Sequence, residues 1–180
     1  IELKLAIDGE VPFNDVQQIL LPRAWRDAGQ VQQDNRGNDI RPQQEMAPCW
    51  LFEVFQDKQG IYVEPYQFYL SAGKHRLTIT AIKGNFAIDH LLFYNQQIPT
   101  YAEVVEEYKA QGYQPADSVF LKIQAEKAEL KSEPLLHGLY DRSSPATEPS
   151  HHANLRLNTI GGSNWNSAGQ WITWKVDIPE

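Results

Sequence analysis

The sequence has little cysteine, and this scarcity limits both its covalent and its catalytic chemistry. Among its 180 residues only Cys49 is a cysteine, so no disulfide can form within the chain and cysteine usage does not identify the compartment. A cysteine nucleophile needs an activating base, and the neighbouring residues of the segment 47–50 provide none. We therefore expect Cys49 to be a buried structural thiol.

Positive charge and long apolar runs are also scarce. Sixteen Lys and Arg against 23 Asp and Glu give a net charge of -7, the wrong sign for binding a phosphate backbone or an anionic membrane. No apolar run approaches the ~20 residues that span a bilayer, so we expect no transmembrane segment. The start of the chain, Ile1 to Lys4, is typical of a strand rather than of a signal peptide. An export signal or surface anchor is therefore expected outside this chain.

Familiar catalytic motifs are missing as well. The sequence has no Gly-x-Ser-x-Gly elbow, no His-Glu-x-x-His, no phosphate-binding glycine loop and no metal-spaced cysteines. Glu106 and Glu107 lie on a predicted helix, where a solvated face explains them, and His151 and His152 lie in a turn-rich loop. We therefore expect that the protein is not an enzyme. The remote alternative is a hydrolase whose catalytic site uses none of these motifs.

What the chain does contain is typical of a folded all-β domain, with 42% hydrophobic and 11% aromatic residues. Ile1, Leu3, Leu5 and Ile7 alternate with more polar residues, as in a strand with one buried face. Similar signals predict strands at 50–55, 62–70, 76–82, 87–94 and 172–178, the fourth of them apolar on both faces as in a central strand.

One helix and two irregular regions interrupt the strand pattern. Thr100 and Glu103 form a capping box and Gly112 is placed to end a helix, which predicts one short helix near 101–111. The polar segment 22–48 is predicted to be a long loop, and 131–152 is a second irregular region. Loops of such length are usually functional or disordered. Many short strands with long connections favour a β-sandwich or jelly roll.

Two parts of the chain resemble the halves of a galactose-binding-like carbohydrate-binding module, in the reverse of the usual order. Segments 6–9 (AIDG) and 69–79 (YLSAGKHRLTI) resemble its closing strands, and segments 123–128 (IQAEKA) and 169–179 (GQWITWKVDIP) resemble its opening strands. Segments 34–42 (DNRGNDIRP) and 157–162 (LNTIGG) also resemble parts of large extracellular solute-binding lipoproteins of bacterial ABC transporters. The two-lobed domain that would hold a transported sugar is absent from the sequence.

The resemblance implies one galactose-binding-like, jelly-roll β-sandwich domain over 1–180. Residues 1–98 resemble the closing half, 99–118 form a helix and linker, and 119–180 resemble the opening half. Either the halves pair within the chain as a circularly permuted sandwich, or they belong to successive modules. We favour the first arrangement, because isolated half-sandwiches would expose strand edges and an apolar face.

Sugar binding requires flat aromatic faces and planar hydrogen-bonding groups on a rigid scaffold. The aromatic candidates are Trp25, Trp50, Tyr62, Tyr66, Trp165 and Trp171, and the polar candidates are Asp34, Asn35, Arg36, Asn38, Asp39 and Arg41. From these we select Trp25, Asn35, Arg36, Asn38, Asp39, Arg41, Trp165 and Trp171 as ligand-binding residues.

These candidates have structural alternatives. Most of the aromatic residues should belong to a sandwich core, as Trp174 beside Ile172 and Val176 should. The polar run is equally explained by a loop that caps its own turns, or by an internal network in which Arg36 or Arg41 pairs with Asp34, Asp39 or Asp27.

The resemblance also implies that a structural calcium ion could bind, with Glu126 as its acidic ligand. The family pattern has a second acid where this chain has Gln124, and calcium takes six to eight oxygen ligands. The sequence therefore predicts no certain cofactor.

From these features we expect a noncatalytic, extracellular carbohydrate-binding module of a bacterial cell-surface sugar-uptake or glycan-handling protein. Carbohydrate is the expected partner, with a solute-binding domain of the same larger protein as a second one. The alternative is a structural module that packs against such a domain without binding sugar.

Overall fold

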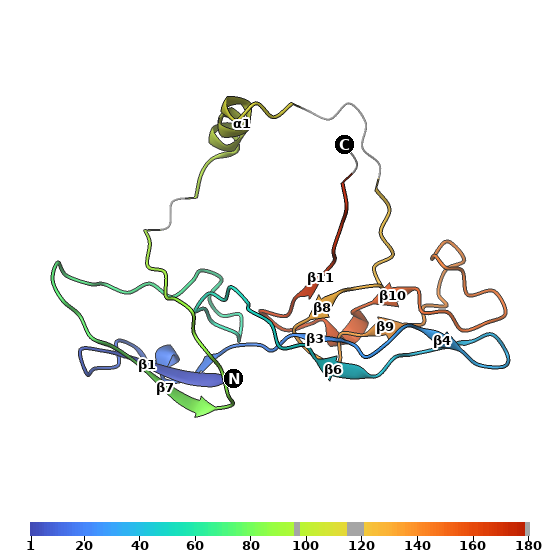
Figure 1. The fold of residues 1–180 in the computed structure, drawn as a ribbon, viewed down its shortest axis with the longest axis horizontal. Coiled ribbons are helices and arrows are strands. Elements are labelled where there is room, and N and C mark those ends of the chain that lie inside the picture. Colours follow the sequence, from blue (N-terminus) through green and yellow to red (C-terminus); the bar gives the residue numbers. More distant parts are fainter. Residues whose placement is uncertain (96–97, 115–120, 179–180) are drawn as a thin grey trace. The chain divides into compact units, whose positions relative to one another are not determined.

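The computed structural model describes residues 1–95, 98–114 and 121–178, and they form a mostly β protein (Figure 1). It has several small antiparallel sheets and one short α-helix. The chain divides into two compact units: Ile1–Asn85 with Ile123–Val176, and Phe86–Lys122 with Asp177–Glu180. The linker expected up to residue 118 lies in part outside the described residues.

A three-stranded sheet contains the beginning of the chain. Its central strand β1 (Glu2–Ile7) pairs on one side with β2 (Ile19–Leu20) and on the other with β7 (Leu77–Lys83). The inward positions of β1 are Leu3 and Leu5, which are buried together with Val16 and Ile19. Val16 comes from the 3-10 turn η1 (Asn14–Gln17). Burying each such side chain contributes about 1.5–3 kcal/mol, so this cluster is the core of the sheet.

A four-stranded sheet joins strands from the two ends of the sequence. Its order is β11 (Ile172–Thr173), β8 (Leu130–Lys131), β3 (Trp25–Asp27) and β6 (Gln44–Met46). The connection is the antiparallel pairing of β3 with β8, where Trp25 lies opposite Lys131. The regions that resemble the closing and opening halves of a module therefore share one sheet.

Two short hairpin-like pairs complete the first unit. The strand β4 (Gln32–Gln33) pairs with β5 (Asp39–Ile40), and β9 (Gly138–Leu139) pairs with β10 (Thr159–Ile160). A second 3-10 turn, η2 (Gly162–Asn164), follows β10 directly.

The predicted first strand, the strand at 76–82 and the helix are confirmed. The strands correspond to β1 and β7, paired in register as Leu5 with Ile79. The helix is α1 (Tyr101–Ala110), and Thr100 and Glu103 form the expected capping box. These elements have strong local signals, which explains why their boundaries could be predicted.

Other strand predictions are wrong. Segments 50–55, 62–70 and 87–94 contain no named strand, apart from an isolated bridge between Gln56 and Pro65. At 172–178 only β11 forms. Conversely, the predicted long loop 22–48 contains β3, β4, β5 and β6. An alternating apolar pattern becomes a strand only where another strand supplies hydrogen-bonding partners, and polar residues can form a ladder where such partners exist.

The prediction that Cys49 is a buried structural thiol is wrong, because Cys49 is exposed. In the described part of the chain, no helix has the length and apolar character needed to cross a membrane.

Candidate functional site

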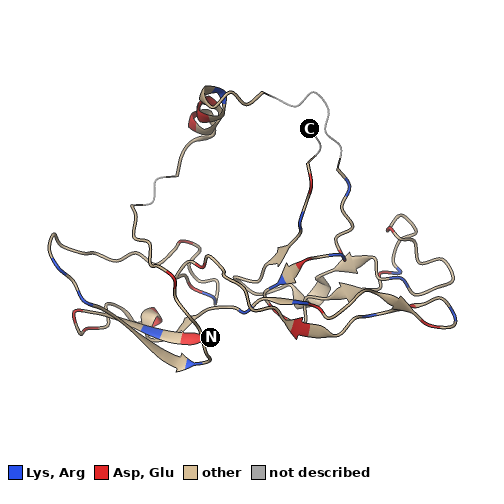
Figure 2. Cartoon of the chain, in the orientation of Figure 1, with Lys and Arg blue, Asp and Glu red and all other residues tan. Residues whose placement is uncertain are grey.

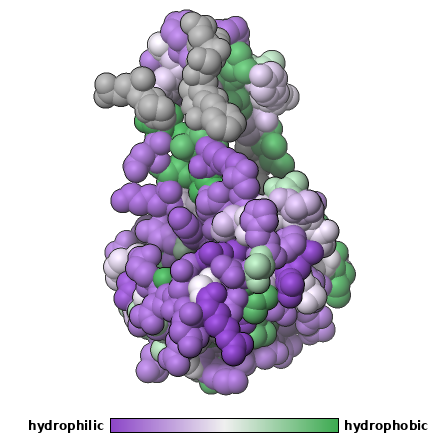
Figure 3. Space-filling view, turned by 90° about the vertical axis from the view of Figure 1, so that its right-hand side faces the viewer, coloured by the Kyte–Doolittle hydropathy of each residue, from purple (hydrophilic) through white to green (hydrophobic). Residues whose placement is uncertain are grey.

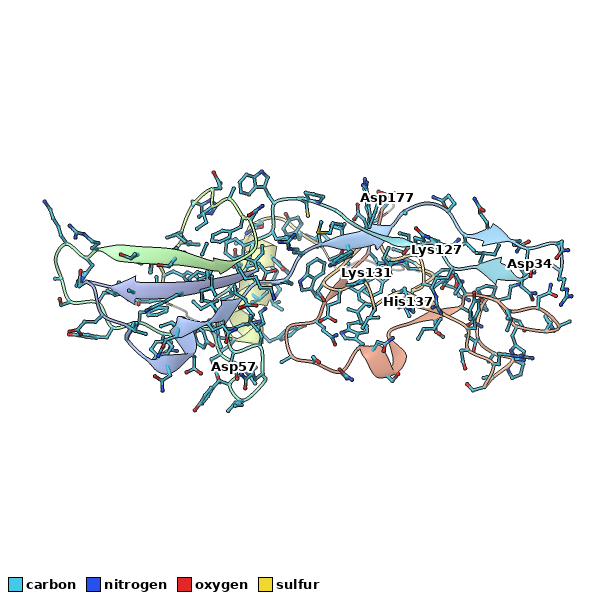
Figure 4. All side chains as sticks on the ribbon, turned by 90° about the horizontal axis from the view of Figure 1, so that it is seen from below. Asp34, Asp57, Lys127, Lys131, His137 and Asp177 are labelled. Carbon is cyan, nitrogen blue, oxygen red and sulfur yellow. The ribbon has the colours of Figure 1, made fainter. Side chains whose placement is uncertain are left out.

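The turn between β4 and β5 is organised by the carboxylate of Asp34, at the tip labelled in Figure 4. Its Oδ1 accepts the backbone N–H groups of Arg36 and Asn38, each at 2.8 Å, and its Oδ2 accepts Asn38 Nδ2 at 3.0 Å. The hydrogen bonds from Asn38, first from its side chain and then from its backbone, hold the pKa of Asp34 below its usual value. Asp34 therefore has a structural role in the turn.

Asn38 and Asp39 attach this hairpin to the segment before β10. Asn38 Oδ1 accepts Leu155 N at 2.9 Å, and Asp39 Oδ2 accepts Leu157 N at 2.9 Å. Arg156 Nη1 donates to Asp39 Oδ1 at 3.2 Å. The internal network considered from the sequence exists, but its arginine is Arg156 rather than Arg36 or Arg41. Asn38 and Asp39 are thus engaged within the chain.

Arg41 is also held by the protein itself. Its Nε donates to the carbonyl oxygen of Gly138 at 3.0 Å, and its guanidinium lies 5.6 Å from the ring centroid of Tyr140. Its Nη1 lies 3.4 Å from Nε2 of His137. Since a guanidinium can only donate, Nε2 is the acceptor here, and His137 Nδ1 donates to the carbonyl of Gly138 at 3.2 Å.

Asn35 and Arg36 are the two predicted polar residues that remain open to a ligand. Both are exposed at the tip of the hairpin. Within the described ranges, neither side chain has a hydrogen-bond or ion-pair partner, although the backbone of Arg36 is held by Asp34. The hairpin can therefore offer one amide and one guanidinium on a fixed turn.

Trp165 lies in a loop whose shape is set by the side chain of Gln170. Gln170 Oε1 accepts the backbone N–H groups of Asn166 and Ser167 at 2.8 and 2.9 Å. Its Nε2 donates to the carbonyl of Asn164 at 2.9 Å. One amide side chain thus satisfies three backbone groups of the loop, which limits its freedom to rearrange.

The indole of Trp165 is fixed but remains accessible. Its Nε1 donates to the carbonyl of Gln170 at 3.4 Å, and the residue is 44% exposed. The ring lies against Gly161: a Cβ built there would come within 2.8 Å of Trp165 Cε3, and Gly161 has a φ of +95°. A glycine is required at this position both for its backbone conformation and for the ring. Trp165 is therefore a supported aromatic surface.

Trp171, in contrast, takes part in a packed polar cluster. Its backbone N–H donates to Ser132 Oγ at 3.0 Å, and the side chain is half-buried. Its indole hydrogen-bonds Glu53, whose Oε2 lies 3.7 Å from Lys58 Nζ. Burial raises the pKa of Glu53, while Lys58 and Trp171 act in the opposite direction. This environment gives Trp171 a structural function.

The loop that carries Glu53 and Lys58 was not predicted from the sequence. Asp57 organises it by accepting the backbone N–H groups of Gln59, Ile61 and Tyr62 at 2.8, 2.7 and 3.1 Å. The loop contacts the Trp165 loop, since a Cβ on Gly169 would lie 2.6 Å from Lys58 Cδ. The turn residues of segment 57–60 (DKQG) are a signal for this loop, but the sequence does not show what it contacts.

Trp25 belongs to the four-stranded sheet, away from any open loop. It is half-buried on β3, opposite Met46 on one side and Lys131 on the other. Lys131 is buried and forms an ion pair with Asp27, which also accepts Gln44 Nε2 at 2.7 Å. Trp25 and these polar residues therefore stabilise the sheet.

Glu126 is a buried carboxylate whose surroundings do not fit a calcium ion. Its Oε2 has no hydrogen-bond partner in the described structure, and burial raises its pKa. The nearby charge of Asp39 acts in the same direction, but the Asp39 carboxylate is already occupied by Arg156 and Leu157. No group of three or more His, Cys, Asp or Glu that could hold a metal occurs among the described residues. Glu126 is thus a single acid rather than part of a ligand set.

Apart from Trp25 on β3, the predicted ligand-binding residues fall into two groups. Asn35, Arg36, Asn38, Asp39 and Arg41 lie on or beside the β4–β5 hairpin, while Trp165 and Trp171 lie in the loop before β11. Within the described chain, no hydrogen bond or ion pair connects Trp165 with the hairpin. Figure 2 shows acidic and basic residues interspersed along the strands and loops rather than gathered by sign.

Comparison of the chain with protein-family models, with curated proteins and with solved structures finds no match.

Proposed function

We propose that this chain is a noncatalytic carbohydrate-binding module that binds sugar on the indole of Trp165. The observation that carries the proposal is the combination of exposure and support at this ring. It is 44% exposed, while Gly161 lies beneath part of it and the Gln170 carbonyl accepts its N–H. A pyranose has an apolar face that stacks on a flat ring held in this way.

Polar groups beside the ring support the same chemistry. Asn166 Nδ2 donates to the carbonyl of Ser163 at 2.8 Å, and Ser167 Oγ donates to Asn166 Oδ1 at 2.9 Å. These side chains are exposed but already oriented, so they lose little freedom when a sugar hydroxyl binds. Asn35 and Arg36 form a second polar group on the hairpin tip.

The finer fold assignment belongs to the same proposal. We infer a circularly permuted jelly-roll sandwich of the galactose-binding-like kind, because β3 and β8 pair residues from the two halves of the sequence. The module would act on the cell surface as part of a larger sugar-uptake or glycan-handling protein, and a solute-binding domain of that protein would be its neighbour.

The exposed apolar side chains favour a second candidate, a module that packs against another protein domain without binding sugar. Trp50 and Val63 are 72% and 85% exposed, and Phe52 and Ile61 are comparably open. Hydrophobic residues also reach the surface on the face drawn in Figure 3. Contiguous exposed apolar patches are typical of contact surfaces.

Calorimetric titration of the purified chain with soluble plant and microbial oligosaccharides tests the first candidate against the second. We expect saturable binding that Trp165→Ala removes, because the stacking surface is lost. Trp50→Ala is the matched control, since it deletes another exposed indole and should leave binding unchanged.

Arg36→Ala tests whether the β4–β5 hairpin contributes to the same site. If it does, this variant binds the same sugar with a weaker affinity. If no oligosaccharide binds, or if Trp50→Ala and Trp165→Ala have the same effect, sugar binding at Trp165 is wrong. The interaction module then becomes the better account.

A further inference from the structure

The end of the β1–β7 pair is closed by two successive contacts between Asp8 and Arg76. Ile7 lies opposite Leu77 in the antiparallel ladder. Asp8, which follows Ile7, therefore faces Arg76, which precedes Leu77. Asp8 N donates to the carbonyl of Arg76 at 2.8 Å, and Arg76 N donates to Asp8 Oδ1 at 2.7 Å. The second carboxylate oxygen of Asp8 remains available.

The ring of His75 uses that oxygen and one more acceptor. His75 Nδ1 lies 2.7 Å from Asp8 Oδ2, and His75 Nε2 lies 2.9 Å from the carbonyl oxygen of Ser71. An ionised carboxylate and a backbone carbonyl can only accept hydrogen bonds. A neutral imidazole carries a single N–H, so it can make only one of these two bonds. Both bonds exist together only when the ring is the imidazolium cation.

We propose that His75 is a pH-sensitive clasp that ties the loop 71–75 to the end of β1 when its ring is charged and releases one side when the ring is neutral. The side chain is 19% exposed, so protons reach it while most of the ring stays in contact with the loop. On deprotonation, one ring nitrogen loses its hydrogen, so that its lone pair faces the oxygen of an acceptor. The contact between these two atoms then becomes repulsive. The loop then loses either its bond to Asp8 or its bond at Ser71.

The charge in direct contact with the His75 ring is that of Asp8, which favours the imidazolium form. Asp8, at the end of β1, is the carboxylate that bonds the ring, and Arg76 follows His75 directly in the chain. Lys74 precedes it, and Glu10 lies in the turn after Asp8, where its backbone pairs with Ile7. Both Lys74 and Glu10 are exposed to solvent, which screens their effect on the ring.

The direction of the pH dependence follows from these partners. The hydrogen bond to Asp8, followed by that to the Ser71 carbonyl, raises the pKa of His75 above its ordinary value of 6.5. The clasp therefore stabilises the folded chain fully below pH 6.5 and loses its effect as the pH rises through the raised pKa. On the acid side, Asp8 stays ionised to an unusually low pH, chiefly because the Arg76 N–H holds its pKa below 3.8.

An NMR titration of the full chain tests the clasp. We expect the His75 ring to titrate above pH 6.5, with both ring nitrogens protonated below that point and the backbone amide signals of 71–76 shifting along the same curve. Asp8→Asn should lower the His75 pKa, because the amide replaces a charged acceptor. His90→Gln is the control, since His90 contacts only Asp89 in the described chain and should not affect the His75 curve.

Two outcomes would overturn the proposal. One is a wild-type His75 ring that titrates at or below pH 6.5. The other is a set of loop amides that does not respond to the His75 titration. Both are measured on the unmodified chain, so a folding defect in the Asp8→Asn variant cannot obscure the result.

Discussion

His75 and His137 show how the same residue type acquires different hydrogen-bonding roles from its immediate partners. The His137 ring lies between a donor, Arg41, and an acceptor, the carbonyl of Gly138. The His75 ring lies between two acceptors and needs both protons. Neither role is evident from the sequence, because the decisive partner of each ring lies more than 60 residues away.

Gly161 is the residue on which the Trp165 surface depends. Gly161→Ala should reduce both the free energy of unfolding and any sugar affinity. The left-handed backbone costs an alanine about 1–2 kcal/mol, and the added methyl group would meet the Trp165 ring at 2.8 Å. Urea denaturation and calorimetry measure the two effects.

Gly9→Ala is the matched control for that experiment. Gly9 has a φ of +88°, but a Cβ there would meet nothing within 4 Å. It should therefore show the backbone cost alone and keep full sugar affinity. Equal losses in the two variants would mean that the ring does not rest on Gly161.

At the scale of elements, the pairing of β3 with β8 contains the one fully buried lysine of the described chain. Figure 4 labels Lys131, whose side chain is 0% exposed and whose partner is Asp27 on β3. Asp27→Asn would leave a buried ammonium group without its counter-charge. We expect a loss of about 3–5 kcal/mol in the free energy of unfolding, measured by urea denaturation.

The neighbouring ion pair on β3 and β6 provides the comparison. Arg26 and Glu45 lie 2.7 Å apart and are both largely exposed, so Glu45→Gln should cost less than about 1 kcal/mol. If Asp27→Asn costs no more than Glu45→Gln, the Lys131 ammonium group has access to water and the pair is not a structural contact.

The helix α1 is expected to depend on its N-terminal cap. It has ten residues and none of them is buried, so little tertiary packing supports it. Thr100→Ala removes the side chain that accepts Glu103 N, and such a loss costs about 1 kcal/mol. Circular dichroism at 222 nm should show reduced helical signal.

Glu106→Gln is a suitable control for the cap, since it breaks the exposed pair of Glu106 with Lys109 and leaves Thr100 intact. Its helical signal should stay close to that of the unmodified chain. A Thr100→Ala chain with undiminished signal would show that contacts other than the cap hold α1.

For the molecule as a whole, stability should be greatest in mildly acidic solution. Hydrogen bonds lower the pKa values of three aspartates below 3.8. The main donor is the Asn38 side chain for Asp34, the Gln59 N–H for Asp57 and Ser143 for Asp141. Their contribution is present above pH 3.8 and is lost as the pH falls through the lowered values. Acid denaturation should therefore begin below pH 3.8.

The half-buried Glu53 and the buried Glu126 act in the opposite direction. Burial raises the pKa values of Glu53 and Glu126 above 4.5, so each favours the folded state at low pH and loses that effect as the pH rises through the raised value. Glu126→Gln should flatten the decline in stability above pH 4.5, which urea midpoints at several pH values will show. An unchanged slope, or a rise in melting temperature with added calcium, would contradict the description of Glu126 as a single buried acid.

Elements whose signals are local could be predicted without the fold. The alternation in β1 and β7 and the capping box of α1 act over a few residues, so no knowledge of the fold is needed to predict them. The sequence left open whether Trp165 is buried or exposed, and its exposure is a property of the folded chain.

Which polar and aromatic residues remain available depends on contacts between segments that are far apart in the sequence. Arg156 rather than Arg36 or Arg41 neutralises Asp39, and the two lie 117 positions apart in the chain. Glu53 accepts a hydrogen bond from the indole of Trp171, and β8 pairs with the edge of β3. Hydrogen bonds and ion pairs of this kind depend on distances between remote segments, which periodicity and spacing do not encode. For that physical reason the residue types needed to bind a sugar could be predicted from the sequence, whereas the side chains still free to bind one could not.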